Sequence, residues 1–276
     1  MTNSPAPEDT DPLALQAVAV RVATTAASLV SRRREQVLGS VRTKSSDTDP
    51  VTLADTESEQ LIRAELAELR PQDSILGEEQ GGGEAVAGGL RWLIDPIDGT
   101  VNFLYGLPFY AVSVAVQQEG QTLAGAVVEV ASGRVFAAAR GHGATLNGEE
   151  LRCNAVQHPH LALLATGFGY QAQRRRTQAA VLATLLPAVR DVRRIGSAAL
   201  DLCGVAAGWV DAYYEHGLNP WDWAAGSLIA AEAGAELRLP AATAMGSAGE
   251  LTFAAAPGVA TELLALVEDA WSGPMP

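Results

Sequence analysis

Cysteine, histidine and lysine are scarce in this chain of 276 residues, which contains two cysteines, four histidines and a single lysine. Cys153 and Cys203 lie far apart and outside any CxxC pattern, which excludes a disulfide framework and a cysteine-bound zinc site. We interpret both as small buried side chains of a reduced, cytoplasmic protein. The histidines show neither metal-binding spacing nor a neighbouring serine-nucleophile motif, and we expect most of them on the surface or in loops.

The single lysine, Lys44, stands in the polar segment KSSDTDP at 44–50. It lacks the preceding glycine of a Walker loop, which excludes a P-loop nucleotide site. An ordinary surface lysine is the plain interpretation. The other basic positions of the chain are arginines, and this contrast favours a functional role for Lys44.

Positive charge is also in short supply, since the formal net charge is -13 at pH 7. A surface of that sign repels nucleic acid, and it handles anionic substrates where bound cations reverse the local field. The best basic cluster, Arg174 to Arg176, is predicted to be a solvated helix start. We therefore expect no nucleic-acid partner.

The N-terminal residues 1–11 are acidic and lack the basic start of a signal peptide, so we expect a disordered leader there. The apolar segment 13–30 is interrupted by Gln16 and Arg21, which argues against a membrane span. A cytoplasmic location without membrane contact is predicted.

Hydrophobic residues make up 48% of the chain, enough for a packed core. Residues 12–155 are predicted to form an α+β half with an antiparallel sheet, and residues 156–276 a layered α/β half. In the first half we expect helices over 13–38 and after an N-cap at Thr52, and strands over 74–77, 90–94, 110–117, 123–130 and 134–139. In the second half we expect strands over 161–166, 210–215 and 251–255, and helices over 177–192, 198–207, 220–233 and 259–271.

Acidic residues gather where these elements begin or end. Asp95 and Asp98 stand in DPIDGT directly after the strand 90–94, although a turn needs one aspartate and a glycine and has no use for a second acid. Glu78 and Glu79 close the strand before it, and Asp222 opens a helix far along the chain. Oxygen-rich turns bind hard divalent cations, and a glycine turn at a helix start suits phosphate, so the pattern indicates metal-assisted chemistry.

Each acid also has a structural interpretation. Asp95 and Asp98 could belong to an ordinary proline–glycine turn, Asp222 to a helix N-terminus, and Asp55 to a capping box with Thr52. The two glutamates could form a solvated strand end. Their joint occurrence at element ends on both sides of the predicted domain boundary favours a site.

A different class of function is indicated by the segment LALLATGFGYQA at 161–172, which has the G-x-G-x-x-A spacing of a dinucleotide fingerprint with Asp191 further on. This is the best case for an NAD-dependent oxidoreductase. We disfavour it because the predicted helix 177–192 fills the place where a second strand should deliver its acid. Two glycines in a turn are the plainer interpretation.

Five motifs in order resemble the inositol monophosphatase family, within the Mg²⁺-dependent, lithium-sensitive phosphatase superfamily. They are KSSDTDPVTLAD at 44–55, LGEE at 76–79, WLIDPIDGTVNFLYGLPFYAVSVAV at 92–116, RRIGSAALDLC at 193–203 and WVDAYYEHGLNPWDWAAGSLIAAEAGA at 209–235. The resemblance runs from about residue 13 to the C-terminus. It implies an α/β/α/β/α sandwich, a homodimer, and a phosphomonoesterase for inositol 1-phosphate. Fructose 1,6-bisphosphatase and histidinol-phosphatase activities are the alternatives among sister enzymes, and a non-catalytic interaction protein is an alternative from another class.

The resemblance also implies a site with two to three Mg²⁺ ions, in which metal-activated water attacks phosphorus without a covalent enzyme intermediate. The implied metal ligands are Glu78, Asp95, the backbone carbonyl of Ile97, Asp98 and Asp222. The implied catalytic residues are Asp55 and Thr100, which would orient the water, together with Glu78. The implied substrate-binding residues are Lys44, Asp98, Gly99, Thr100, Arg194, Gly196, Ser197, Ala198, Glu215 and Asp222. The GGGE insert at 81–84 and the segment 169–172 depart from the animal enzymes, so the resemblance implies no substrate contacts there.

Overall fold

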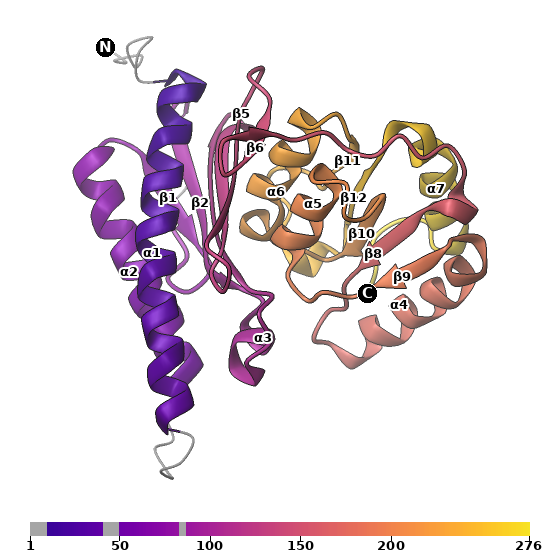
Figure 1. Ribbon diagram of the computed structural model, residues 1–276, viewed down its shortest axis with the longest axis horizontal. Helices are drawn as coiled ribbons and strands as arrows, with labels where there is room; N and C mark the ends of the chain where they lie inside the picture. Colours follow the sequence, from indigo (N-terminus) through magenta and orange to yellow (C-terminus); the bar gives the residue numbers. More distant parts are fainter. Residues whose placement is uncertain (1–9, 41–49, 83–86) are drawn as a thin grey trace.

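The computed structural model describes residues 10–40, 50–82 and 87–276, and in these ranges the chain folds into five layers (Figure 1). The layers are α1 with α2, a seven-stranded sheet, α5 with α6, a five-stranded sheet, and α4 with α7. This is the predicted α/β/α/β/α sandwich. Lys44 and residues 1–9 of the predicted leader lie outside the described residues.

The first layer consists of α1 (Pro12–Ser40) and α2 (Pro50–Leu69). By length and composition, α1 could cross a membrane over Pro12–Glu35. In this fold, Leu15, Val22 and Val30 recur at helical spacing and are buried against the seven-stranded sheet, as in a core helix. The predicted N-cap at Thr52 is wrong, because α2 begins with a proline two residues earlier, at a position where its fixed φ and missing N–H suit a helix start.

The seven-stranded sheet follows chain order from β1 to β7. β1 (Ser74–Gly77) pairs in parallel with β2 (Leu90–Asp98), and all later neighbours pair antiparallel. The other strands are β3 (Ala111–Gln118), β4 (Gln121–Glu129), β5 (Arg134–Ala139), β6 (Ala144–Leu146) and β7 (Glu149–Glu150). β2 is four residues longer than predicted, so DPID belongs to the strand and not to a turn after it.

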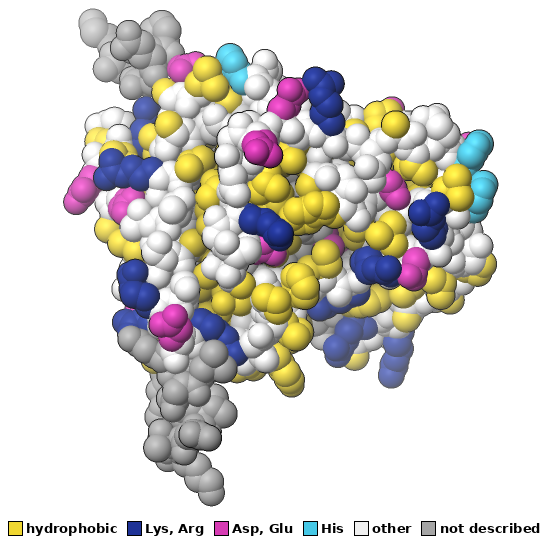
Figure 2. Space-filling view, viewed as in Figure 1, with side chains coloured by type: hydrophobic (Ala, Val, Ile, Leu, Met, Phe, Trp, Pro, Cys, Tyr) yellow, Lys and Arg dark blue, Asp and Glu magenta, His cyan; other side chains and the backbone are white. Residues whose placement is uncertain are grey.

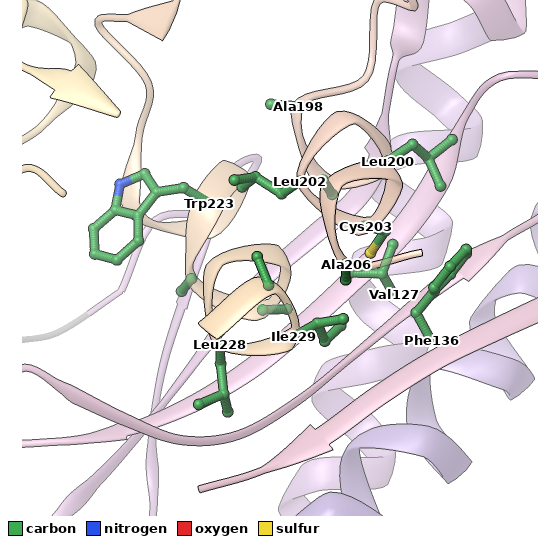
Figure 3. Close-up of a cluster of buried hydrophobic side chains, with 14 of the residues drawn as sticks. Val127, Phe136, Ala198, Leu200, Leu202, Cys203, Ala206, Trp223, Leu228 and Ile229 are labelled. Atoms are coloured by element: carbon green, nitrogen blue, oxygen red, sulfur yellow. The ribbon is translucent and has the colours of Figure 1, made fainter. Parts of the chain in front are cut away.

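The middle layer, α5 (Ala198–Ala206) and α6 (Pro220–Glu232), packs between the two sheets. Figure 3 shows Cys203 and Ala206 of α5 and Ile229 of α6 close to Val127 and Phe136 of the first sheet. Both helices are rich in alanine and almost entirely buried, because each faces a sheet on two sides. This layer therefore joins the two halves of the chain into one core.

The five-stranded sheet has the order β11-β12-β10-β8-β9, with β8 parallel to β9 and β10, and β12 antiparallel to β10 and β11. Its strands are β8 (Leu163–Thr166), β9 (Asp191–Arg193), β10 (Ala212–His216), β11 (Glu236–Arg238) and β12 (Leu251–Ala255). The last layer consists of α4 (Ala172–Leu185) and α7 (Pro257–Ala270). The predicted helix 177–192 is wrong at its end, because Pro187 lies in a 3₁₀ turn that stops α4, and the chain then enters β9.

Arg174 corrects the prediction of a solvated basic cluster. Its side chain is buried at the start of α4 and donates hydrogen bonds to the carbonyl oxygens of Gly246 (2.8 Å) and Pro276 (3.0 Å). Arg175 and Arg176 are exposed, as predicted. Acidic and basic side chains are both scattered over the face shown in Figure 2.

Candidate active site

β2 presents Asp95 and Asp98 on a β-bulge. The register against β3 shifts between them, so that β2 advances three residues where β3 advances two. Pro96 fits this bulge because it has no N–H to leave unpaired in the ladder. The Ile97 N–H donates to Asp95 Oδ1 over 3.0 Å, which fixes the first carboxyl. Both acids therefore lie in a bulged strand, whereas the sequence alone indicated a turn.

The next residue, Gly99, has a left-handed backbone with φ 92° and leads into the short helix α3 (Thr100–Tyr105). A Cβ at this position would lie 2.8 Å from the Phe109 carbonyl oxygen and 3.3 Å from Ser197 Cβ, so only glycine fits. The Thr100 hydroxyl donates to the Ile97 carbonyl oxygen over 3.0 Å. The carbonyl implied as a metal ligand is therefore directly beside the threonine implied to orient water.

Asp98 faces the N-terminus of α5. Its Oδ2 accepts hydrogen bonds from the Ser197 hydroxyl (2.5 Å) and from the Ala199 N–H (2.7 Å), and the N–H of Ala198 also bonds the carboxylate. The Ser197 hydroxyl accepts the Leu200 N–H as the N-cap of α5. The predicted segment 196–198 therefore meets the DPIDGT motif, and a helix N-terminus favours the negative charge of Asp98.

Asp222 stands in the first turn of α6 and closes a capping box with Asn219, whose N–H donates to Asp222 Oδ2 over 2.8 Å. The structural interpretation of this residue is therefore confirmed. The same carboxyl is also a charged neighbour of Asp98, Glu78 and Glu215. One aspartate thus caps a helix and belongs to the acid cluster at once.

Glu78 follows β1 and meets the carboxyl of Asp95. Although much of the Glu78 side chain is open to solvent, the protein atoms around its carboxyl raise its pKa from 4.5 to about 7, and a hydrogen bond from Asp95 offsets part of this rise. Burial raises the pKa of Asp98 to about 6, while the bonds from α5 oppose that rise. Glu79, the residue after Glu78, also has a raised pKa, because of burial and the charge of Glu59.

Asp95 and Asp222 have pKa values well above their usual range. Burial is the first cause for both, and the charges of the other cluster acids are the next for Asp95. Asp55, which is buried on α2, is one of the acids that raise the pKa of Asp95. The charge of Arg194 lowers the pKa of Asp98, but the pKa values of all four carboxyls stay raised, so positive charge around the cluster is incomplete. The cluster is therefore electrostatically suited to bind cations.

The donor chemistry of this cluster fits a hard divalent cation, because carboxylate and carbonyl oxygens are the ligands that Mg²⁺ prefers. The described residues contain no group of three or more His, Cys, Asp or Glu side chains already drawn together to hold a metal ion. Asp98 and Asp222 instead point at the backbone N–H groups of Ala199 and Asn219.

A second acidic group lies beside the first. Burial raises the pKa of Glu215 to about 7, while the Tyr213 hydroxyl, which donates to Glu215 Oε2 over 2.7 Å, and the charge of Arg194 oppose the rise. Asp201 of α5 is buried next to Glu215 and Asp98, and the Gly196 N–H bonds it. The predicted residues Arg194, Gly196 and Glu215 therefore adjoin the carboxylate cluster.

The loop that contains Gly196 is held from the other half of the chain. Asn102, in α3, donates through Nδ2 to the carbonyl oxygens of Phe109 (2.7 Å) and Ile195 (2.9 Å). Sequence reasoning assigned no role to Asn102, Asp201 or Tyr213. Tyr213 could have been found, since it lies two residues before Glu215 in a strand and so shares its face.

The dinucleotide pattern at 161–172 does lead into a second parallel strand, so the reason given against it was wrong. Asp191 nevertheless stands at the first position of β9, whereas a ribose-binding acid lies at the carboxyl end of its strand. A Cβ on Gly167 would lie 1.7 Å from Glu215 Oε2, so this glycine makes room for a carboxylate. The first glycine of the pattern therefore lies against the acidic site.

The chain thus has a layered α/β fold in which carboxylates of both halves meet. The chain matches the inositol monophosphatase family over residues 11–272 and belongs to that family. It is therefore an enzyme of the phosphoric monoester hydrolase class.

Relatives of this chain are similar to it in sequence and structure along most of its length. An inositol-1-monophosphatase of Mycobacterium leprae is 56% identical over 94% of this chain and 95% of its own length. A protein of Escherichia coli K12 called Nus factor SuhB is 40% identical over 79% of this chain and 82% of its own. The solved structure of Mycobacterium tuberculosis SuhB superposes with a TM-score of 0.83, at 51% identity, over 95% of this chain and 98% of that one.

Proposed function

We propose that this enzyme is a Mg²⁺-dependent phosphomonoesterase that hydrolyses inositol 1-phosphate to inositol and phosphate. The observation that carries the proposal is the meeting of Glu78 after β1, Asp95 and Asp98 of β2, and Asp222 of α6, in surroundings that raise the pKa of each carboxyl. Clustered acids of this kind destabilise a protein unless a cation or a proton compensates them. The family and the name of the Mycobacterium leprae relative support the choice of substrate.

Two to three Mg²⁺ ions would be held by Glu78, Asp95, the Ile97 carbonyl, Asp98 and Asp222. When bound, such ions supply positive charge that polarises the phosphate ester, lowers the pKa of water and stabilises the leaving oxygen. The helix N-terminus beside Asp98 would also favour the anionic substrate.

The residues of this chain would orient the reacting groups around phosphorus. Gly99 and Thr100 offer backbone N–H groups to the phosphate. Asp55, buried on α2 as a neighbour of Asp95, and the Thr100 hydroxyl would orient the attacking water, and the Asp55 carboxylate would take up its proton. Lys44, which lies outside the described residues, is a further proposed substrate-binding residue.

The polyol would lie toward the second sheet. Glu215 and Arg194 would bind its hydroxyls, and the backbone of Gly196, Ser197 and Ala198 would line the same side. The Tyr213 hydroxyl donates to Glu215 Oε2 and so orients the carboxyl. Hydrogen-bonding sites of this kind discriminate strongly between substrates, because a missing partner leaves a buried polar group unpaired.

The substrate is tested by measuring phosphate release from inositol 1-phosphate, fructose 1,6-bisphosphate and histidinol phosphate in Mg²⁺ buffer. We expect the highest kcat/KM for inositol 1-phosphate. A higher value for either of the other two would replace the proposed substrate with that of a sister enzyme. Absence of hydrolysis of all three would remove the proposed activity.

The Escherichia coli relative called Nus factor SuhB favours a second candidate function, that of an interaction protein. The retained acids argue for catalysis, since a pure scaffold has no need of clustered buried carboxylates. The two functions are separable, because substitution of Asp95 should abolish phosphate release and leave any protein contact intact.

We further propose a cytoplasmic homodimer that binds neither nucleic acid nor membrane. Residues 101–109 carry five large apolar side chains that are exposed by 43–76%, and Figure 2 shows apolar side chains on the face that includes α3. A contiguous apolar surface of this kind is typical of contacts between subunits. Sedimentation equilibrium should give twice the mass of the chain, and a monomer at micromolar concentration would contradict the proposal.

A further inference from the structure

Tyr170 is the most exposed large aromatic side chain in the described part of the molecule, with 80% of its surface accessible. It stands in the loop between β8 and α4, in the segment for which the family resemblance implied no substrate contact. An aromatic ring left open to solvent needs an explanation when it stands close to a functional site.

The position of this loop follows from the sheet. β8 and β10 are parallel neighbours, with Thr166 opposite Tyr214, so the residues after β8 leave the sheet at the same edge as Glu215. Gly167 passes directly over the Glu215 carboxylate, where a Cβ would find no space. The loop therefore begins in contact with the polyol-binding side of the proposed site.

The loop is also held at its other end. The Gly169 N–H donates to Gln178 Oε1 over 2.9 Å, and a Cβ on Gly169 would come within 3.1 Å of Arg174 Cδ. Gln178 in turn donates to the His216 carbonyl oxygen, and Arg174 is fixed by the carbonyl of Gly246. The backbone that leads to Tyr170 is thus anchored on the second sheet and on α4, which keeps this residue beside the site.

The charges around Tyr170 agree with this position of the loop. Glu78, Asp98, Asp222 and Arg194, from four separate segments of the chain, all act electrostatically on its phenol. Burial raises the pKa of the phenol, and the three acids raise it further. Because Gly167 packs against the Glu215 carboxylate and the exposed Tyr170 follows three residues later, Tyr170 stands beside the mouth of the site.

On the basis of the proposed phosphatase function, we propose that Tyr170 determines specificity by forming an aromatic wall against which the ring of a cyclic polyol phosphate packs. A polyol ring presents C–H faces between its hydroxyls, and an aromatic side chain offers it a large contact area at low entropic cost. A small acyclic ester, such as glycerol 2-phosphate, has no ring face to pack against this wall.

The test compares kcat and KM for inositol 1-phosphate and glycerol 2-phosphate in wild type, Tyr170→Ala and Tyr170→Phe. We expect Tyr170→Ala to raise KM for the cyclic substrate about tenfold, in the range typical of apolar substrate contacts. Its kinetics with the acyclic substrate should stay unchanged. Tyr170→Phe should retain the ratio of the two kcat/KM values, because it keeps the ring.

Leu186→Ala serves as the control, since Leu186 is an exposed apolar side chain beyond the far end of α4. An unchanged ratio in an active Tyr170→Ala enzyme would overturn this inference and leave the proposed function standing. An equal loss on both substrates would show a general effect and would also overturn it. If wild type hydrolyses neither ester, the proposed function itself fails.

Discussion

The Ser197 hydroxyl donates to Asp98 Oδ2 over 2.5 Å, although the two residues are 99 positions apart. Asp98 ends a strand of the first sheet, and Ser197 caps the first helix that packs between both sheets. The bond is accompanied by one from the Ala199 N–H. A single carboxylate thus caps a buried helix and joins the two halves of the site.

Substitution of Ser197 should damage both stability and activity. Ser197→Ala removes the N-cap of α5 and one donor to Asp98, so we expect the free energy of unfolding to fall by about 1–2 kcal/mol. We also expect kcat/KM for inositol 1-phosphate to fall by at least about tenfold, because Asp98 loses a fixed orientation. Urea unfolding and phosphate release measure the two effects.

Ser227→Ala is the matched control for that substitution. Ser227 is equally buried, but its hydroxyl bonds only the Ala224 carbonyl within α6. Its activity should stay close to wild type. An equal loss of activity in the two variants would show that the Ser197–Asp98 bond has no particular role.

Gly167 should tolerate no side chain. In Gly167→Ala the new Cβ would lie 1.7 Å from Glu215 Oε2, so the carboxylate must move. A displacement of about 1 Å at a substrate-orienting group lowers kcat/KM about a hundredfold. Steady-state kinetics with inositol 1-phosphate measure this loss.

Gly204→Ala provides the comparison for a glycine with space around it. A Cβ there meets Val210 Cγ2 at 3.5 Å, an ordinary contact, in the interior of α5. We expect full activity and a gain of roughly 0.5–1 kcal/mol in the free energy of unfolding. Similar activity losses in both glycine variants would contradict the assigned role of Gly167.

His216 should make the protein less stable in acid. Its side chain is buried in β10, and burial together with the charge of Arg174 lowers its pKa from 6.5 to about 4. Between these values the unfolded chain binds a proton that the folded chain does not, so the free energy of unfolding falls as the pH drops from about 6.5 to 4. The loss is at most about 1.4 kcal/mol per pH unit.

The contribution of His216 is isolated by comparison with His216→Phe in Mg²⁺-free buffer. Glu215 and Glu78, whose folded pKa values are raised, act in the opposite direction, and they are present in both proteins. The stability advantage of wild type over the variant should shrink by roughly 2–3 kcal/mol between pH 7 and pH 4. Parallel pH curves would show that the buried imidazole does not titrate in this way.

The sequence predicted much of the fold because hydrophobic patterns are local. The strand at 90–94 was evident from its apolar run, but its extension through Asp95 and Asp98 was not, because a proline and two aspartates indicate a turn. A bulge against β3 keeps these residues in the sheet, and pairing with a partner strand cannot be read from one segment. The helix predicted over 177–192 was wrong at its end for a local reason, since Pro187 cannot continue a helix and α4 stops before it.

Site residues that belong to a sequence motif could be predicted. Residues whose burial depends on distant segments of the chain could not. Asp95, Asp98 and Glu215 could be named from their motifs. The burial of Arg174 depends on the carbonyl of Pro276, 102 positions away, so a run of three arginines suggested only a charged surface. Asp201 was likewise overlooked, because an acid in the first turn of a helix has an ordinary explanation.

The proposal that the buried acids bind Mg²⁺ and drive phosphate release is tested most directly with Asp95→Asn. Glu129→Gln is the control, because Glu129 is a buried carboxylate that bonds Ser132 and Arg134 away from the cluster. Phosphate release from inositol 1-phosphate and the Mg²⁺-induced rise in unfolding temperature are measured in wild type and both variants, with and without EDTA.

We expect wild type and Glu129→Gln to need Mg²⁺ for activity and to be stabilised by it. Asp95→Asn should lose at least about a hundredfold in rate and most of the stabilisation, because it removes one of the proposed carboxylate ligands of Mg²⁺. Equal rates in wild type and Asp95→Asn, or full wild-type activity in EDTA, would contradict the metal-dependent mechanism.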